Sequence, residues 1–250
     1  MKPVYFHTYL FRIQFFLAPM AAKTVLITGS NRGIGLAFAK HYKTEGWKVI
    51  SCARDVDGAT ELKQLEPWKL LSLDTSNEDS INAVAKALKD IPINLLINNA
   101  GIMDVQGLQS TTKADLLRHF EVNAVGPFLM TRAMLPNLRL AVKDQGSAFV
   151  AQMTSRMGSI TDNGSGGVYG YRASKTALNM ITKSLAIDLK EENIGCLLLH
   201  PGYVNTAMVG FQGTVSTDDS VKGLTKIIAN AKLEDSAKMF HFEKGEVLPW

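Results

Sequence analysis

A tyrosine and a lysine stand four residues apart in the sequence Tyr171-Arg172-Ala173-Ser174-Lys175. In a helix this spacing places both side chains on one face. A nearby ammonium group stabilises a phenolate, so it lowers the pKa of the tyrosine from its usual value of about 10. A tyrosine adjusted in this way can donate or accept a proton near neutral pH. The pair is therefore a candidate for acid–base chemistry, and the alternative is an exposed tyrosine and lysine on a solvated helix face.

The residues around this pair predict alternating strands and helices. The segment 171–189 is expected to be a long helix, because its apolar residues recur at helical spacing. Another helix is expected over 128–135, where Pro136 interrupts it. The predicted strands cover residues 24–27, 48–53, 69–73, 93–97, 148–153 and 196–199, with a seventh over 238–242. This order predicts an α/β fold with one doubly wound parallel sheet and helices on both of its faces.

Two polar stretches are expected to begin helices. Ser76-Asn77-Glu78-Asp79 has the pattern of a capping box, in which the first side chain and the fourth each bond the other's backbone N–H. Thr112-Lys113-Ala114-Asp115 precedes an apolar stripe and is expected to cap a further helix.

A glycine-rich turn, Thr28-Gly29-Ser30-Asn31-Arg32-Gly33-Ile34-Gly35, joins the first predicted strand to a helix. Gly29 lets the chain turn sharply, Gly33 lets the backbone approach a phosphate, and Gly35 lets the helix start close to the sheet. The free N–H groups of the first helical turn then face an anion. Strand, glycine turn and helix in this order are typical of a site for a dinucleotide pyrophosphate, although glycines in such a turn are often only structural.

Further polar or glycine-containing clusters follow other predicted strands. Asp74 follows the third strand, Asn98-Asn99-Ala100-Gly101 the fourth, and His200-Pro201-Gly202 the sixth. In an open α/β sheet, ligands bind beyond the carboxyl ends of the strands. These clusters are therefore expected at the same site as the glycine-rich turn.

The composition favours a globular protein of one domain. Of the 250 residues, 46% are hydrophobic and 20% are charged, which argues against disorder. The net charge is +4 and the basic residues are scattered, so we expect no nucleic-acid partner. Cys52 and Cys196 lie in separate predicted strands, where we expect small buried residues rather than a disulfide or metal pair. We therefore expect no metal site, and the thiols fit a reducing compartment.

Residues 1–19 differ from the rest of the chain. They are rich in aromatic residues, lack acidic ones, and carry Lys2 and Arg12. Arg12 splits the apolar run, so we expect no stable membrane insertion. A signal peptide or a mitochondrial presequence is the alternative to a simple appendage. We expect residues 1–20 to be an extension outside the fold, residues 21–250 to form one domain, and the protein to be cytoplasmic, with a mitochondrial location as the alternative.

Together these motifs resemble those of the classical short-chain dehydrogenase/reductases, over almost the whole chain from Ala22 onward. The matching stretches are Thr28 to Gly35, Asn98 to Gly101, Val122-Asn123-Ala124-Val125-Gly126, Ser155, Tyr171 with Lys175, and Pro201-Gly202 with Val204 and Thr206. Within that family, residues 155–160, 169–175 and 248–250 are most similar to the C-factor/sniffer-type carbonyl reductases. The resemblance implies a Rossmann-like dinucleotide-binding oxidoreductase domain over residues 21–250.

The resemblance also implies roles for four residues. Tyr171 would be the general acid that protonates a carbonyl oxygen as hydride arrives, and Ser155 would hydrogen-bond that oxygen. Lys175 would bind the nicotinamide ribose and lower the pKa of Tyr171. Asn123 would hold a water that links Lys175 to solvent. The cofactor would supply the hydride, while the protein would supply position, protons and electrostatics.

A site for NADP(H) is implied along the strand ends. Val204 and Thr206 would hold the nicotinamide carboxamide, and Asn99 and Gly101 would line the adenosine side. The implied cofactor-binding residues are Gly29, Ser30, Asn31, Arg32, Gly33, Ile34, Gly35, Arg54, Asp74, Asn99, Ala100, Gly101, Tyr171, Lys175, Pro201, Gly202, Val204 and Thr206.

The end of the second predicted strand bears on the choice of dinucleotide. NAD-linked members of the family place an acidic residue there, but this chain has Ala53 followed by Arg54. Arg54 and Arg32 can hold a 2′-phosphate by paired, charge-assisted hydrogen bonds. Asp55 would complicate this preference for NADPH if it turned toward the ribose, but we expect it to be a solvated turn residue.

Three residues are alternatives to those named above. Ser159 competes with Ser155, but Ser155 stands directly at the end of its predicted strand. Tyr169 competes with Tyr171 but has no lysine four residues later, and His200 is expected to be a packed structural residue rather than a catalytic base. Ser155 and Tyr171 are sixteen residues apart, somewhat more than in many relatives, and the glycine-rich segment 163–167 can absorb the excess.

The segment 202–220 is expected to cover the substrate. Its apolar side chains predict a partly apolar pocket, and its glycines would permit movement, as in a lid. These apolar residues and glycines are Tyr203, Met208, Val209, Phe211, Gly210 and Gly213.

The sequence favours an NADPH-dependent enzyme that reduces an aldehyde or ketone to an alcohol. The alternatives are an NAD-linked alcohol dehydrogenase and a signalling protein that binds the dinucleotide without turnover. The complete set of Asn123, Ser155, Tyr171 and Lys175 argues against the signalling protein, because binding alone needs no proton donor. The expected partners are a small carbonyl substrate and further copies of the chain, in a homodimer or homotetramer paired through the helices over 127–142 and 171–189.

Overall fold

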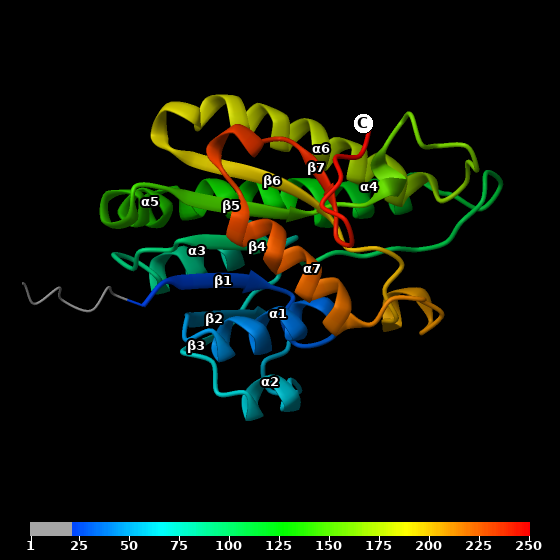
Figure 1. The fold of residues 1–250 in the computed structure, drawn as a ribbon. Helices are drawn as coiled ribbons and strands as arrows, with labels where there is room; N and C mark the ends of the chain where they lie inside the picture. Colours follow the sequence, from blue (N-terminus) through cyan, green and yellow to red (C-terminus); the bar gives the residue numbers. More distant parts are fainter. Residues whose placement is uncertain (1–21) are drawn as a thin grey trace, which may run out of the picture.

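Seven parallel strands form one sheet, with all of their carboxyl ends at the same edge (Figure 1). The computed structural model describes residues 22–250. The strand order is β3-β2-β1-β4-β5-β6-β7. The strands are β1 Thr24–Thr28, β2 Lys48–Ala53, β3 Lys69–Ser72, β4 Leu95–Asn98, β5 Ala148–Met153, β6 Ile194–His200 and β7 Met239–His241. The strand order reverses between β1 and β4, which is where sheets of this kind bind their ligands.

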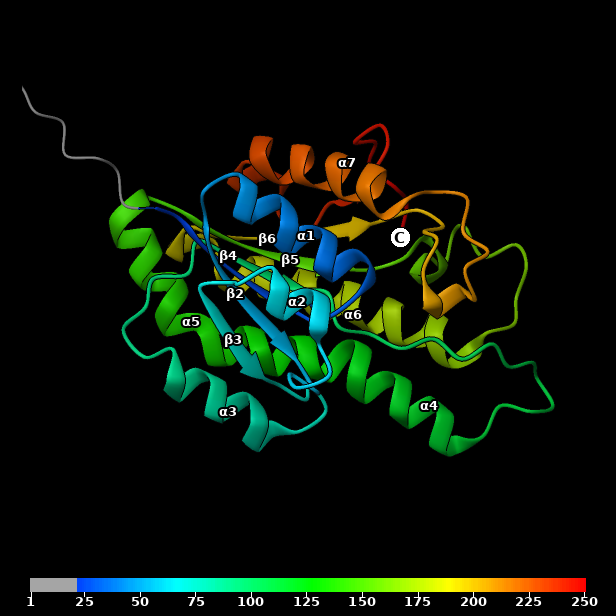
Figure 2. The same cartoon turned by 90° about the horizontal axis from the view of Figure 1, so that it is seen from below.

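Helices cover both faces of the sheet, which confirms the predicted doubly wound arrangement (Figures 1 and 2). The helices are α1 Gly33–Thr44, α2 Thr60–Gln64, α3 Glu78–Ala87, α4 Lys113–Phe120, α5 Gly126–Gln145, α6 Tyr169–Asp188 and α7 Thr217–Asn230. Successive residues of a strand point to opposite faces. Val25 and Ile27 therefore pack in one apolar cluster with α1 and α7, and Leu26 packs in the other with α3, α5 and α6.

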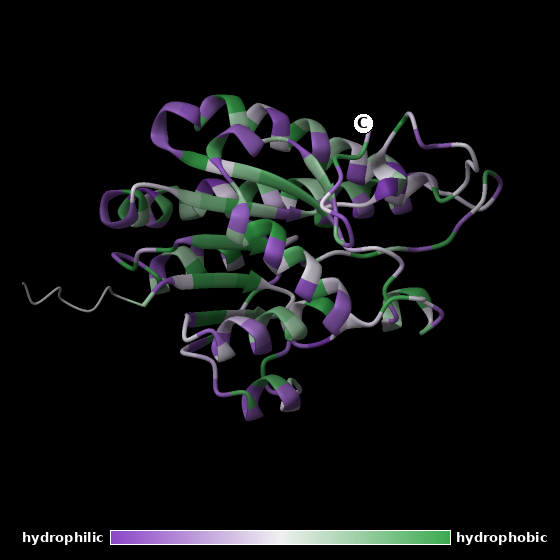
Figure 3. Ribbon diagram, viewed as in Figure 1, coloured by the Kyte–Doolittle hydropathy of each residue, from purple (hydrophilic) through white to green (hydrophobic). Residues whose placement is uncertain are grey.

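The central strands are mostly apolar, because both faces of the sheet are buried (Figure 3), although a few polar residues such as Ser51 and Gln152 are buried among them. The helices instead alternate apolar and hydrophilic residues, as helices with one solvated face do (Figure 3). None of the helices in the described part of the chain is both long enough and apolar enough to cross a bilayer. The expected extension over residues 1–20 lies outside the described residues.

The helix α5 corrects one expectation from the sequence. Pro136 was expected to interrupt a helix at residue 135, but α5 continues through it to Gln145 and ends at Gly146, which has φ +82°. A proline inside a helix costs about 3 kcal/mol. Leu138 and Ala141 lie beyond the proline and are completely buried against the sheet, so their packing offsets that cost.

The predicted helix starts are only partly confirmed. Thr112 and Asp115 form the expected capping box, in which each side chain accepts a hydrogen bond from the backbone N–H of the other. At α3 the cap is Asn77, whose Oδ1 accepts from Ser80 N at 2.9 Å. Ser76 does not cap this helix, since its hydroxyl donates to Asp74 Oδ1 at 2.7 Å.

Candidate active site

The helix α6 brings Tyr171 and Lys175 to the carboxyl edge of the sheet. Both side chains are buried, with 8% and 5% of their surface exposed. The start of α6 packs closely on α4. A Cβ atom at Gly170 would lie only 2.8 Å from Nδ1 of His119 in α4. Glycine at position 170 therefore lets the two helices approach, and this approach sets the depth of Tyr171.

Lys175 is anchored to the sheet by its amino group. Its Nζ atom donates a hydrogen bond of 2.7 Å to the carbonyl oxygen of Met153, the last residue of β5. The same atom lies 5.7 Å from the centre of the Tyr171 ring. Burial lowers the pKa of Lys175 to about 8, because desolvation disfavours the ammonium.

The pKa of Tyr171 differs from the expectation. Lys175 was expected to lower it, but burial of the phenol raises it above its usual value. The opposing effect comes from a hydrogen bond with Ser155, which lowers the pKa. In this structure desolvation of Tyr171 therefore outweighs any stabilisation of its phenolate, and the tyrosine is held in its protonated form.

Ser155 is the buried serine at the end of β5. Its Oγ atom accepts from Met157 N at 3.1 Å and so begins the short 3₁₀ turn Arg156–Gly158. The alternative serine, Ser159, is almost completely buried, and its hydroxyl accepts from Asp162 N within a turn. Ser155, rather than Ser159, is thus the serine that lies close enough to Tyr171 to lower its pKa.

The alternative tyrosine, Tyr169, and the histidine, His200, are not in positions suited to acid–base chemistry. Tyr169 lies at the surface, with 40% of its area exposed. His200 is packed against His241, and its Nδ1 atom faces the backbone N–H of Arg156 at 3.3 Å. Burial lowers the pKa of His200 to about 4, and the charges of His241 and Arg156 act in the same direction. His200 is therefore neutral at pH 7, as a packed structural residue is.

Asn123 lies in a π-helical turn, Glu121–Val125, between α4 and α5. Its Oδ1 atom accepts from Ile102 N at 2.9 Å, and its Nδ2 atom donates to Ile102 O at 2.9 Å and to Ser174 Oγ at 3.0 Å. Both amide hydrogens are thus used within the protein. A relay water would therefore have to use an acceptor of Asn123, either the remaining lone pair of Oδ1 or its backbone carbonyl oxygen.

The glycine-rich turn has the geometry that a phosphate site needs. Gly29 and Gly33 have φ values of +64° and +55°, and a Cβ atom at Gly35 would lie 2.2 Å from Gly29 O. Arg32 precedes α1 but gives it no side-chain cap, and the first turn of α1 contains no acidic residue. The N–H groups at the start of α1 are thus left for an anion from outside the helix.

Several of the implied cofactor residues brace the site. The Nδ2 atom of Asn99 donates to the carbonyl oxygens of Thr28 and Gly29, both at 3.0 Å. The Oγ1 atom of Thr28 accepts from the backbone N–H groups of Asn99 and Ala100. Ser30 is buried and donates to Cys52 O. Sequence reasoning did not assign Thr28 this role, and its position before the first glycine was the available signal.

Two further implied cofactor-binding residues, Arg54 and Asp74, lie after β2 and β3. Arg54 is exposed, and Ala53 before it is buried, so no carboxylate occupies that position. Asp55 turns away into a local turn, where its Oδ1 atom accepts from Gly58 N at 2.9 Å. Hydrogen bonds from Ser76 lower the pKa of Asp74, and the nearby charge of Arg54 lowers it further.

The segment after β6 folds over the carboxyl edge. Gly202 has φ +85°, and Val204 pairs with Val215, which ties the two ends of the segment together. The methyl carbon of Thr206 comes within 3.3 Å of where a Cβ atom of Gly33 would lie. The exposed apolar side chains of this segment are Tyr203, Met208 and Phe211.

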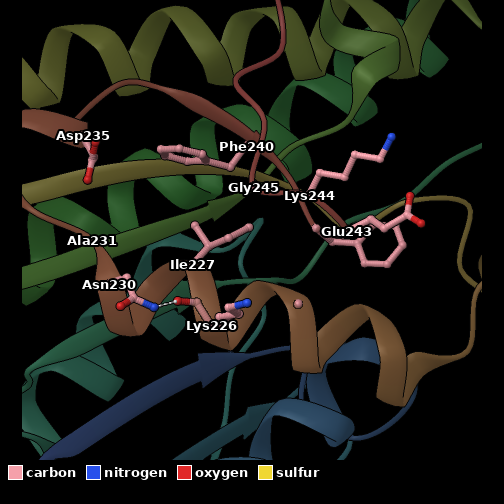
Figure 4. Close-up of a pocket in the computed structure, with 11 residues that line it drawn as sticks. Lys226, Ile227, Asn230, Ala231, Asp235, Phe240, Glu243, Lys244 and Gly245 are labelled. Atoms are coloured by element: carbon pink, nitrogen blue, oxygen red, sulfur yellow. Dashed lines mark hydrogen bonds between the residues drawn. The ribbon is translucent and has the colours of Figure 1, made fainter.

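A separate hollow of about 270 Å³ lies between α7 and the turn after β7 (Figure 4). Ile227 and Phe240 give it apolar walls, and Lys226, Glu243 and Lys244 stand around it (Figure 4). None of the residues assigned to catalysis lines it. The candidate active site is therefore the carboxyl edge of the sheet and not this hollow.

The chain is similar to known proteins over nearly all of its described length. The family model of the short chain dehydrogenases matches residues 23–215. The chain therefore belongs to the short-chain dehydrogenase family. Within it, the chain is most like the C-factor and sniffer types. The C-signal of Myxococcus xanthus is 43% identical over 160 residues, which cover 64% of this chain and 93% of that protein.

Two solved carbonyl reductases share the fold. NADPH-bound carbonyl reductase from chicken fatty liver has a TM-score of 0.86 and 34% identity, covering 92% of this chain and 99% of that one. The carbonyl reductase Sniffer of D. melanogaster has a TM-score of 0.86 and 31% identity, covering 92% of this chain and 100% of that one. These similarities support an oxidoreductase that acts on a carbonyl group.

Proposed function

We propose that this protein reduces an aldehyde or ketone to an alcohol with NADPH, and that Tyr171 is the general acid. The observation that carries the proposal is the burial of Tyr171 and Lys175 at the sheet edge where α1 begins without a side-chain cap. A buried proton donor beside an open anion site is what hydride transfer from a dinucleotide to a carbonyl needs.

The residues at the sheet edge fit a nicotinamide dinucleotide. The start of α1 offers free N–H groups, and the close approach that Gly35 permits leaves no side chain in their way. When bound there, the dinucleotide supplies the hydride. Lys175 would hold the ribose on the nicotinamide side, and Val204 with Thr206 would hold the carboxamide.

The acid step depends on two residues of the chain. Tyr171 is protonated at neutral pH, and Lys175 would have to offset the rise in pKa that burial causes for its hydroxyl to donate a proton readily to the carbonyl oxygen of a substrate. Ser155, which lies close enough to Tyr171 to lower its pKa, would donate a second hydrogen bond to that oxygen and so fix its position. Asn123 would support the proton supply through a water that donates to its carbonyl or amide oxygen.

A preference for NADPH over NADH is supported by charge. Arg54 and Arg32 are both exposed, and neither forms an ion pair with any side chain among residues 22–250. Arginine holds a phosphate by two parallel hydrogen bonds. Asp55, which could have favoured NADH, is instead occupied by its bond from Gly58.

A second candidate function is supported by one relative. The protein from Myxococcus xanthus is called a signal and not an enzyme. A protein that binds the dinucleotide without turnover is therefore the alternative. An NAD-linked dehydrogenase acting in the oxidative direction is a third, since a relative from Rhodococcus sp. that is 32% identical over 235 residues is named a dehydrogenase.

One experiment separates these functions. Oxidation of NADPH and of NADH is followed with a panel of aldehydes and ketones, and reduction of NADP⁺ and NAD⁺ with the matching alcohols. We expect turnover with carbonyls and NADPH. Binding of NADPH without turnover of any substrate would favour the signalling protein, and faster turnover of alcohols with NAD⁺ would favour the dehydrogenase.

A further inference from the structure

The loop between Ser155 and Tyr171 is held by an arginine to which the proposed reaction gives no role. This loop, residues 156–167, carries the exposed glycine-rich stretch that lengthens the spacing between the serine and the tyrosine. A Cβ atom at Gly164, Gly166 or Gly167 would meet nothing within 4 Å. No neighbouring residue packs against these glycines. The conformation of the glycine-rich stretch must therefore be fixed by hydrogen bonds.

Arg172 provides such hydrogen bonds to both ends of the loop. Its Nη1 atom donates to Met157 O at 3.3 Å, near the start of the loop. Its Nε atom donates to Gly166 O at 3.2 Å and its Nη2 atom to Ser165 Oγ at 2.7 Å, near the end. One rigid guanidinium thus joins residues eight or nine positions apart in the sequence, and a planar group with several fixed donors is suited to this.

The same face of α6 makes further contacts with the loop. Thr176 Oγ1 and Asn179 Nδ2 both donate to Gly158 O, at 2.9 and 3.2 Å. Arg172, Thr176 and Asn179 recur at helical spacing, so they form one side of α6. Tyr171 and Lys175 are each one position earlier than Arg172 and Thr176. The helix α6 therefore carries Tyr171 and Lys175 on one side. The adjacent side binds the loop that follows Ser155.

The segment after β4 is hydrogen-bonded to the end of this loop. The backbone N–H of Val168 donates to Gln106 O at 3.0 Å, which joins the end of the loop to the segment after β4. Val168 has φ +49°, a left-handed conformation that costs a β-branched residue about 1–3 kcal/mol and persists only where the surroundings impose it. The backbone N–H of residue 172 bonds Val168 O, a main-chain bond that is independent of the arginine side chain.

We propose that Arg172 is a positioning residue, which fixes the loop 156–167 and thereby the place of Ser155 and the carbonyl substrate relative to Tyr171. This inference rests on the proposed carbonyl reduction. Arg172 touches neither reacting atom in this scheme and acts through the loop alone. Its loss should affect the carbonyl substrate much more than the dinucleotide, whose implied binding residues all lie outside the loop 156–167.

The test replaces Arg172 by Met, which keeps an unbranched apolar stem and removes every donor. Hydrogen–deuterium exchange of peptides from 156–167 should become about tenfold faster, because a hydrogen bond from a charged donor changes an equilibrium by about that factor. The KM for the carbonyl should rise by a similar factor, while the KM for NADPH changes less than twofold. Arg172→Lys, which retains one charged donor group, should recover part of both effects.

Two further variants keep the result interpretable. Arg139→Met removes an exposed arginine that pairs with Glu192 on another part of the molecule, and it should change neither exchange in the loop nor the carbonyl KM. Ser165→Ala removes one acceptor from the loop without altering α6, so it should show a smaller effect in the same direction even if Arg172→Met fails to fold.

Two outcomes would overturn the proposal. Unchanged exchange in 156–167 for both Arg172→Met and Ser165→Ala would show that the arginine does not hold the loop. Faster exchange with unchanged kinetics for the carbonyl would show that the held loop does not position the substrate. A wild-type protein that reduces no carbonyl would contradict the proposed function instead, and the exchange measurement would still decide whether Arg172 holds the loop.

Discussion

The Nζ atom of Lys175 lies 2.7 Å from the carbonyl oxygen of Met153, so α6 is joined to the last residue of β5. Ser155 follows Met153 by two residues. The bond therefore couples the position of the lysine to that of the serine, and both to Tyr171. The sequence does not predict this hydrogen bond, because its acceptor is a backbone atom that every residue has.

We expect the buried ammonium of Lys175 to lower the stability of the folded protein at neutral pH. Folding lowers the pKa of Lys175 from 10.5 to about 8. Below pH 8 the lysine is charged in both states, and burying that charge in the folded protein costs free energy. Between pH 8 and 10.5 the unfolded chain binds more protons, and stability therefore rises with pH through this window. Lys175→Met should remove a penalty of up to about 3 kcal/mol at pH 7, less the loss of the bond to Met153.

Urea unfolding of Lys175→Met and of the wild type at several pH values measures this penalty. The difference in unfolding free energy between the two should shrink as the pH rises from 8 to 10.5. Lys190→Met, a change of an exposed lysine in the turn after α6, is the control. A difference that does not vary with pH would mean that Lys175 is solvated in the folded protein.

Tyr171→Phe tests the proton donor. The change keeps the buried ring and removes the hydroxyl, so kcat should fall about 10²- to 10⁴-fold while NADPH still binds. Stopped assays of carbonyl reduction, together with NADPH fluorescence, measure the two effects. Tyr169→Phe is a matched control, because that tyrosine lies two residues away and is exposed. Near-normal turnover in Tyr171→Phe would refute the assignment.

Arg54→Ala combined with Arg32→Ala tests the choice of dinucleotide. Each arginine is expected to hold the 2′-phosphate by charge-assisted bonds, so the KM for NADPH should rise about tenfold or more. The KM for NADH should change little, since NADH lacks that phosphate. Steady-state kinetics with both dinucleotides give the comparison. Equal losses for the two, or a wild-type preference for NADH, would show that these arginines do not select NADPH.

The strands could be predicted because both faces of the sheet are buried, which leaves continuous apolar runs such as Leu95 to Ile97. The Tyr171–Lys175 pair could be predicted because helical spacing alone puts it on one face. The π-helical turn around Asn123 and the passage of α5 through Pro136 could not, since tertiary packing decides both. The raised pKa of Tyr171 was also missed, because spacing reports a neighbouring charge but not the depth of burial.

The outer faces of α4 and α6 carry exposed apolar side chains, Leu117, Phe120, Met180 and Ile187. The sequence resemblance predicts at least a dimer paired through α5 and α6, and the exposed apolar side chains on α6 favour association through that helix. Light scattering should then give a mass of at least twice 27.3 kDa. Met180→Asp should shift the protein toward the monomer, and Lys226→Asp on α7 should not. A wild-type mass of 27.3 kDa at all concentrations would contradict the dimer.

Residues 22–250 contain the whole seven-stranded sheet and every residue assigned to the site. The first strand begins at Thr24, and Lys23 O already accepts the bond from Lys48 N that opens the pairing with β2. A chain that begins at Met20 should therefore fold and keep its activity, with a melting temperature within a few degrees of the full chain. Circular dichroism and the carbonyl assay, run side by side on both chains, check this. Loss of soluble protein from the shorter chain would mean that residues 1–19 contribute to the fold.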